Sequence, residues 1–188
     1  MRVTKAQAQA NRALIVETAS ALFRERGYDG VGVADLMAAA GFTHGGFYKH
    51  FGSKADLMAE SAACGISKTL ERSSGVDAAA FFNFYVSRQH RDERGSGCTM
   101  AALGGDATRQ PDEIKAIFAQ GIEGMLATLD HEGDTQGQDA RAQMIGLFAQ
   151  AVGAIVLSRA CPDDSPLADE IIDLCRSQIL AAIPENAS

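Results

Sequence analysis

The stretch that decides the fold runs from Val33 to Lys54 and reads VADLMAAAGFTHGGFYKHFGSK. It predicts two short helices, at about residues 33–40 and 44–50, on either side of a turn at Gly41. A glycine at such a turn lets the chain bend sharply between two crossed helices, which is typical of a helix-turn-helix. The residues expected to pack between these two helices are Leu36, Met37, Ala40, Phe42 and Phe47.

The second short helix carries residue types that suit DNA. In a helix-turn-helix the second helix lies in the major groove, with its N-terminal residues toward the base edges. Thr43 is placed to cap this helix, whose N–H groups attract phosphate, and Gly45-Gly46 would let DNA approach the backbone. Lys54 stands in the first turn of the next helix, where acids are preferred, so an external anion is indicated. The predicted DNA-binding residues are Thr43, His44, Gly46, Tyr48, Lys49, His50 and Lys54.

The rest of the chain divides into further helices, since alternating strand-like runs are nearly absent. A helix over residues 5–26 ends at Gly27, a glycine placed as a C-cap, and Ser53-x-x-Asp56 predicts a capping box that opens a long helix. The remaining helices are expected at about 54–72, 77–90, 100–109, 112–129, 139–159 and 167–183. The predicted fold is all-α with about nine helices, a three-helix head at 1–53 and a ligand-binding and dimerisation domain at 54–188.

Charge is distributed unevenly along the 188 residues, whose net charge is −7. Residues 1–60 hold seven Lys and Arg against six Asp and Glu, while the remainder holds ten against eighteen. The first sixty residues therefore carry a net charge of +1 and can face phosphate, because distribution matters more than the sum.

The N-terminal sequence resembles the tetracycline-repressor (TetR) family of bacterial regulators. The resemblance begins at Arg12, continues through Gly27-Tyr28 and Ala40-Gly41-Phe42, and ends in the phrase from Gly46 to Leu57. It covers about the first sixty residues. It implies nine or ten helices, a homodimer on a palindromic operator, and a ligand cavity in the larger domain, most relatives being repressors that release DNA when a small molecule binds.

By this resemblance, Tyr48 and Lys54 would touch phosphates, and Thr43, His44, Gly46 and Lys49 would lie nearest the bases. One departure stands at Val31-Gly32, where relatives usually carry Thr-Ser or Thr-Thr before the second helix. A capping hydroxyl is therefore missing, although glycine is tolerated as a cap. His44 and Gly46 are also less common choices, so the operator sequence cannot be taken from a relative.

The middle and last helices offer a ligand site and a dimer interface, or alternatively an ordinary core. Residues that could line a cavity for a small apolar effector are Phe81, Phe84, Tyr85, Met100, Leu103, Phe118, Ile122 and Met125. The helices at 139–159 and 167–183 hold more apolar residues than a small domain needs to bury, which favours dimerisation through them. Cys98, at the start of a helix that would lower its pKa, is the alternative trigger, as an electrophile or redox sensor; the other interpretation is a packing residue.

Other functional classes lack support in the sequence. The four cysteines, at 64, 98, 161 and 175, form no CxxC pair, so no metal site or other cofactor is expected. Cys98 has no evident His and Asp partners, and no phosphate loop is present, so we expect no enzyme. The polar N-terminus and the absence of 18 consecutive apolar residues predict a cytoplasmic protein without a membrane span. A protein-interaction adaptor with a vestigial head is the remaining alternative.

Overall fold

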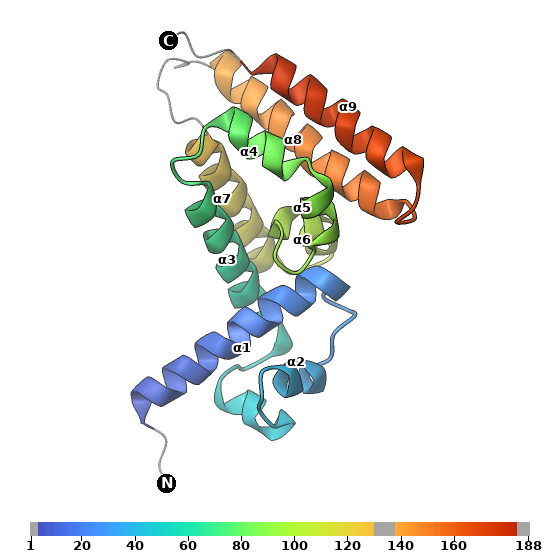
Figure 1. Ribbon diagram of the computed structural model, residues 1–188. Helices are drawn as coiled ribbons and strands as arrows, with labels where there is room; N and C mark the ends of the chain where they lie inside the picture. Colours follow the sequence, from blue (N-terminus) through green and yellow to red (C-terminus); the bar gives the residue numbers. More distant parts are fainter. Residues whose placement is uncertain (1–3, 130–137, 184–188) are drawn as a thin grey trace. The chain divides into compact units, whose positions relative to one another are not determined.

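The computed structural model describes residues 4–129 and 138–183, and within them it consists of helices without a β-strand (Figure 1). The expectation of an all-α fold with about nine helices is confirmed. In chain order the helices are α1 (Lys5–Arg26), α2 (Val33–Ala39), the 3-10 helix η1 (His44–Lys49), α3 (Lys54–Ser73), α4 (Ala78–Tyr85), α5 (Arg88–Asp92), α6 (Thr99–Ala107), α7 (Asp112–Leu129), α8 (Gln138–Ala160) and α9 (Pro166–Ala182).

The chain forms two compact units. Unit 1 comprises the described residues up to Lys68 together with Cys98–Gly121, and unit 2 comprises Thr69–Gly97 together with the described residues from Ile122 onward. The helices α3 and α7 therefore each contribute residues to both units. The division expected at residues 53 and 54 is one of function, and it stays a prediction.

In unit 1, α1 begins and ends where its capping residues stand. The Thr4 hydroxyl accepts a hydrogen bond from the Gln7 N–H, and Gly27 ends the helix with a φ of 73°, a conformation that favours glycine. One apolar face of α1 is buried, as Ile15, Ala19 and Phe23 show. This face anchors α1 in the core of unit 1.

The helix-turn-helix forms around Gly41, whose φ is 81°. The Phe42 N–H donates to the Met37 carbonyl at 2.8 Å, which closes the turn. Leu36, Met37 and Phe47 are buried, as expected from the sequence. The second helix is a 3-10 helix, and its first residues include two glycines, which are poor α-helix formers.

In unit 2, α8 and α9 lie side by side, and α4 packs against α9 (Figure 1). The single helix expected at 77–90 is wrong, because the chain forms two helices, α4 and α5. Ser87 separates them: its backbone is extended, and its hydroxyl accepts the His90 N–H at 3.1 Å as the N-cap of α5. Serine favours such caps over helix interiors.

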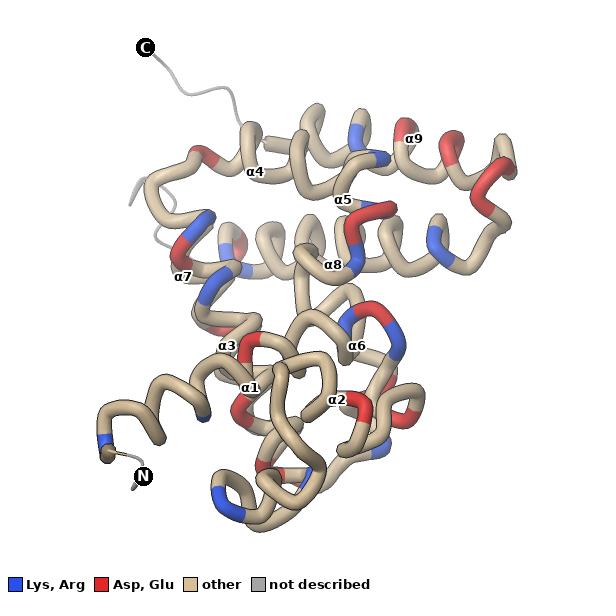
Figure 2. Tube along the Cα trace, turned by 60° about the horizontal axis from the view of Figure 1, so that its bottom comes forward, with Lys and Arg blue, Asp and Glu red and all other residues tan. Residues whose placement is uncertain are grey.

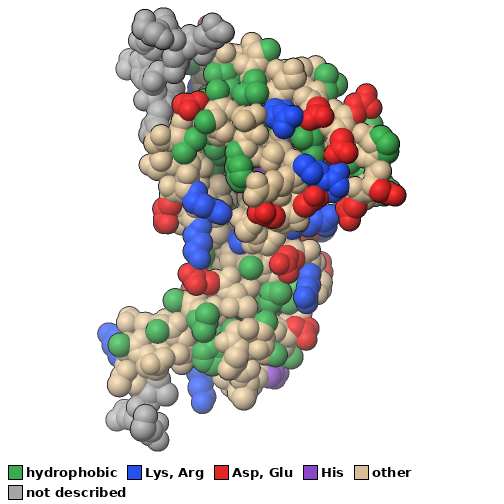
Figure 3. Space-filling model, viewed as in Figure 1, with side chains coloured by type: hydrophobic (Ala, Val, Ile, Leu, Met, Phe, Trp, Pro, Cys, Tyr) green, Lys and Arg blue, Asp and Glu red, His purple; other side chains and the backbone are tan. Residues whose placement is uncertain are grey.

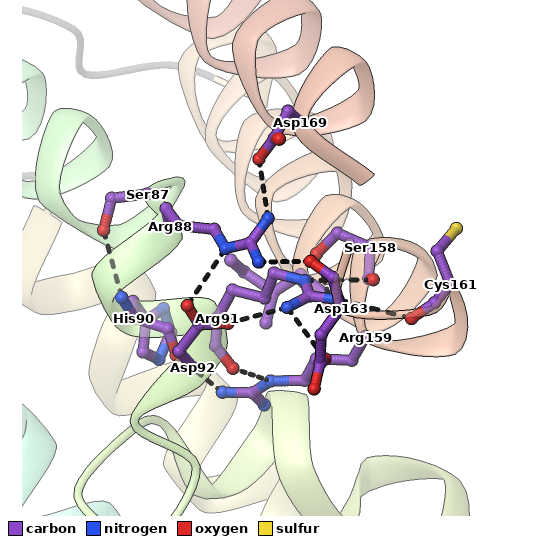
Figure 4. A network of polar contacts seen from close by, with 11 residues as sticks. Ser87, Arg88, His90, Arg91, Asp92, Ser158, Arg159, Cys161, Asp163 and Asp169 are labelled. Atoms are coloured by element: carbon purple, nitrogen blue, oxygen red, sulfur yellow. Dashed lines mark hydrogen bonds and ion pairs between the residues drawn. The ribbon is translucent and has the colours of Figure 1, made fainter. Parts of the chain in front are cut away.

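A buried arginine joins α5 to the turn between α8 and α9 (Figure 4). The Arg91 side chain is 1% exposed and donates to the Ser158 and Cys161 carbonyls at 3.1 and 3.3 Å. It also pairs with Asp92 at 2.7 Å and Asp163 at 3.2 Å. Every side of this guanidinium thus meets an acceptor, which is the condition for burying a charge.

Two further arginines extend this network. Arg159 of α8 donates back to the His90 and Arg91 carbonyls, at 2.7 and 2.9 Å. The exposed Arg88 pairs with Asp92 and with Asp169 of α9, at 3.0 and 2.8 Å. The network fixes the α8–α9 hairpin to α5 within unit 2.

We expect Arg91→Ala to lower the free energy of unfolding by about 3 kcal/mol, because it leaves buried carbonyls and Asp163 without their donor. The matched control is Arg88→Ala, which removes an exposed ion pair of the same network and should change stability little. Urea denaturation of both variants measures the difference. Equal effects of the two substitutions would contradict this account of the network.

Candidate nucleic-acid interface

The short helix η1 has one buried side and one exposed side. Phe47 is 1% exposed and packs edge-on against Tyr48 and tilted against Phe51, with ring centroids 5.2 and 5.5 Å apart. Tyr48, the next residue, is 69% exposed. The anchor at Phe47 therefore holds η1 so that its other side faces solvent.

The predicted DNA-binding residues lie on or beside this exposed side. Thr43, His44, Tyr48 and Lys49 are exposed, while Gly46 and His50 are half-buried. Lys, Arg and His side chains are seen at the molecular surface in Figure 3. Thr43 is the N-cap residue of η1, as expected, but its side chain makes no capping hydrogen bond to this helix.

Arg12 of α1 supports the far end of η1. Its Nε donates to the His50 carbonyl at 3.3 Å, and its guanidinium lies 4.5 Å from the centroid of the Phe51 ring. The same guanidinium pairs with both carboxylate oxygens of Glu60 on α3, and this hydrogen bonding raises the pKa of Arg12. Arg12 is part of the family resemblance, but the sequence does not indicate this role, because the partners of Arg12 lie 38 and 48 residues away.

Lys54, a predicted phosphate contact, is half-buried and already has a partner. Its ammonium donates to the Tyr28 carbonyl at 2.6 Å and lies 5.8 Å from the centroid of the Phe23 ring. An ammonium has three N–H donors, so Lys54 can donate to a second acceptor, such as a phosphate, while it keeps the bond to Tyr28. The lysine thus holds the corner between α1 and α2, whether or not it also meets phosphate.

The capping box before α3 is confirmed. The Ser53 hydroxyl accepts the Asp56 N–H at 3.1 Å, and the Asp56 carboxylate accepts the Ser53 N–H at the same distance. Asp56 also accepts the Gly52 N–H, and a Cβ at Gly52 would lie 2.9 Å from this carboxylate. The box fixes the link from η1 to α3.

Comparison with known proteins identifies this domain. Residues 15–60 match the family model described as bacterial regulatory proteins, tetR family. Over these residues the chain is similar to the tetR family of bacterial regulatory proteins. It is 43% identical to the HTH-type transcriptional regulator TtgR of Pseudomonas putida over 58 residues, which are 31% of this chain. The matched stretch covers only 28% of the length of TtgR, so this similarity concerns the N-terminal domain.

Solved structures of similar fold cover nearly the whole of this chain. The reduced form of E. coli NemR aligns with a TM-score of 0.75 and 19% identity, covering 95% of this chain and all of NemR. FadR of Bacillus subtilis, solved in complex with stearoyl-CoA, aligns with a TM-score of 0.60 and 17% identity, covering 92% and 99%. At these identities the likeness concerns the fold.

The predicted ligand-binding residues do not fall in one unit of the chain. Unit 2 holds Phe81, Tyr85 and Met125, which are buried, and also Phe84 and Ile122, which are exposed. The remaining members, Met100, Leu103 and Phe118, are buried in unit 1. As a ligand site the set stays a prediction.

The buried aromatic residues of unit 2 form a cluster around Tyr85. Its ring lies 5.3 Å from Phe81, 4.5 Å from His90 and 6.0 Å from Phe148, measured between centroids. Burial lowers the pKa of His90 to about 4, so this histidine is neutral at pH 7. His90 and Phe148 belong to this cluster and were absent from the predicted set.

Cys98, the predicted redox candidate, is the N-cap residue of α6 and is buried. Its position at a helix start is as expected, and its sensor role stays a prediction. None of the four cysteines, Cys64, Cys98, Cys161 and Cys175, forms a disulfide. Within residues 4–129 and 138–183, no group of three or more His, Cys, Asp or Glu side chains could hold a metal ion.

Lys54→Ala should weaken binding to all DNA sequences, and the slope of log affinity on log salt should fall by about one if its ammonium also meets a phosphate. Substitutions of His44 or Lys49 should instead change the sequence preference. Gel shifts at several salt concentrations measure both quantities. The control is Lys115→Ala, a lysine of α7 paired with Asp112. If Lys54→Ala behaves like this control, Lys54 has no part in DNA binding.

Proposed function

We propose that the protein is a DNA-binding transcriptional regulator, a repressor that binds a palindromic operator as a homodimer and releases it when a small molecule binds. The observation that carries the proposal is the exposed side of η1, held outward by the buried Phe47. The exposed polar side chains of η1 can meet base edges, and the glycine at position 46 lets DNA approach the protein backbone closely. The similarity to TtgR, an HTH-type transcriptional regulator, supports it.

The proposal is one of binding, without an enzymatic reaction, and we place the protein in the cytoplasm. It is tested by selecting bound duplexes from a random pool, which reports the operator and its half-site spacing together. A two-fold protein should select two inverted half-sites, about one DNA turn or a multiple apart. A strictly monomeric protein that retains no duplex would refute it.

The proposed dimer interface lies on α8 and α9. Along α8, a set of exposed apolar or small residues falls on one helical face. They are Ala142, Ile145, Gly146, Ala149, Val156 and Ala160, and on α9 the exposed Leu167 and Leu174 lie seven positions apart, about two helical turns. An apolar face of this kind on a monomer favours association.

The composition of α8 supports the same proposal. Residues Asp139–Ala160 are long and apolar enough to cross a membrane by length and composition alone, yet 28% of the most apolar window is buried in the monomer. The helix also carries Arg141, Gln143 and Gln150, so it contains no run of 18 consecutive apolar residues. A second copy would cover this surface.

Acidic positions of unit 2 gather along α9 and at the turn before it (Figure 2).

We expect Val156→Glu to convert the dimer into a monomer and to weaken operator binding, because it places a charge on an apolar face that a partner must cover. Light scattering measures the oligomeric state. The control is Leu14→Glu, which changes a similarly exposed apolar residue of α1, 48% against 46% exposed. If both variants remain dimeric, the interface lies elsewhere.

The proposed effector is a small apolar molecule bound among the residues 61–129. The aromatic cluster around Tyr85 supports this, as does the fold shared with FadR, which was solved with stearoyl-CoA. DNA would be released if the ligand binds more tightly to a state of the dimer in which the two DNA-binding domains no longer match the spacing of the operator half-sites. The helix α3 begins beside η1 and contributes residues to both units, so it is the segment that we expect to carry this change.

A second candidate trigger is modification of Cys98. It rests on the position of this thiol at the N-terminus of α6 and on the shared fold with NemR, whose reduced form is known. A thiol of this kind would respond to electrophiles or oxidants, and the response would not need a reversible ligand.

One variant separates the two triggers. Cys98→Ser should keep DNA release by a reversible apolar ligand and should lose release by an electrophile such as N-ethylmaleimide. Gel shifts with each added compound measure this, and the Cys175→Ser variant, at a half-buried cysteine of α9, is the control. Complete dependence of release on Cys98, with no reversible ligand found, would favour the thiol trigger.

A further inference from the structure

Within unit 1, the C-terminal end of α6 contacts the corner where α1 ends. The Asp106 carboxylate accepts the Tyr28 N–H at 3.1 Å, across 78 residues of sequence. Its other oxygen accepts from the Arg109 guanidinium at 2.6 Å. Asp106 thus provides a charged acceptor for the first peptide N–H after Gly27, the residue that ends α1.

Gly27 makes this approach possible. Its φ of 73° favours glycine, and a Cβ there would lie 2.8 Å from the Asp106 Oδ2. Contacts under 3.0 Å essentially do not occur for real Cβ atoms. The glycine is therefore needed for the carboxylate to sit against this corner, in addition to its role as a helix C-cap.

The Tyr28 peptide is held at both ends of its residue. Its N–H donates to Asp106, and its carbonyl accepts from Lys54 at 2.6 Å. The ring is 1% exposed and packs edge-on against Phe23 at 5.1 Å. Burial first, and then the charge of Asp106, raises the pKa of the Tyr28 phenol. Tyr28 is thus the residue at which α6 and α3 both hold the corner leading to α2.

The N-terminal end of α6 lies against the same helices. A Cβ at Gly65 of α3 would lie 2.4 Å from the Thr99 hydroxyl and 2.8 Å from the Ser20 hydroxyl of α1. Gly65 therefore lets α6 and α1 approach α3 closely. With Asp106 at its other end, α6 contacts the three-helix head (residues 1–53) at both ends of the α6 helix.

We propose that Asp106 is a positioning residue for DNA binding, which ties α6 to the corner between α1 and α2 through the Tyr28 N–H. This inference rests on the proposed function. Because α2 begins five residues after Tyr28, a shift of this corner changes where α2 and η1 lie relative to α1. An event at α6 is thereby transmitted to the surface that reads DNA, with no contact between Asp106 and DNA.

The geometry distinguishes this role from that of a surface ion pair. Arg109 is 64% exposed and can be removed without touching Tyr28. An asparagine at 106 retains an oxygen that can accept the Tyr28 N–H, but it loses the charge. A glutamate retains the charge but cannot occupy the same place against Gly27. A positioning role thus predicts that asparagine rescues and that glutamate does not.

The test uses full-length variants and the duplex selected by the wild-type protein, at one salt concentration. Asp106→Ala should lower affinity about tenfold, the loss expected for a hydrogen bond to a charged acceptor. Asp106→Asn should stay within about threefold of wild type, and Arg109→Ala should be unchanged. Should Asp106→Ala fail to fold, Asp106→Glu replaces it, with the same expected loss.

A second readout needs no DNA. Amide hydrogen exchange of the Tyr28 N–H should be faster in Asp106→Ala and unchanged in Arg109→Ala. Wild-type affinity in Asp106→Ala, or in Asp106→Glu, would overturn the positioning role while leaving the proposed function intact. If the wild-type protein itself binds no duplex, the proposed function fails, and a positioning role in DNA binding fails with it.

Discussion

The burial of Phe47 is the constraint on which the candidate interface depends. A six-residue 3-10 helix has too few internal hydrogen bonds to be stable alone, so tertiary packing must hold it. Phe47 supplies that packing from the inner side, while Arg12 holds the far end through the His50 carbonyl. With the inner side occupied, the polar residues of η1 have solvent on their other side. The buried ring of Phe47 thus determines which side chains of η1 face solvent.

The start of the chain was the most predictable part, because local signals determine it. The bounds of α1 agree with the sequence because Thr4 and Gly27 are strong caps, and the capping box at Ser53 fixes the start of α3. The expected helix at 77–90 was wrong for a related reason: Ser87 is a capping residue directly after an apolar run, and the apolar pattern outweighed it. Local periodicity does not register such a break.

Contacts between residues far apart in sequence were beyond prediction. The pairing of Asp106 with the Tyr28 N–H spans 78 residues, and that of Arg91 with the Ser158 carbonyl spans 67. Their acceptors and donors include backbone groups, which every residue has, so no residue pattern announces them. The candidate DNA-binding residues could be named from the sequence, whereas the residues that position them could not.

Some helix glycines are explained by close packing, whereas others weaken their helix without a packing reason in the structure. Gly121 of α7 is explained within unit 1, since a Cβ there would meet Ile66 at 2.8 Å. At Gly104 and Gly105 of α6, and at Gly146 and Gly153 of α8, a Cβ would meet nothing within 4 Å. Each such glycine weakens its helix by about 0.5–1 kcal/mol relative to alanine.

The two pairs of unexplained glycines fall on α6 and α8, the helices that carry the proposed positioning residue and the proposed dimer interface. For α8, Gly146 lies on the apolar face that a second copy would cover, where a missing side chain allows close approach of a helix. For α6, the weakened helix relies on its attachments at Thr99 and Asp106, and elements of low local stability are those that move in regulation. The two glycines of α6 thus give more weight to the contacts that hold this helix at Thr99 and Asp106.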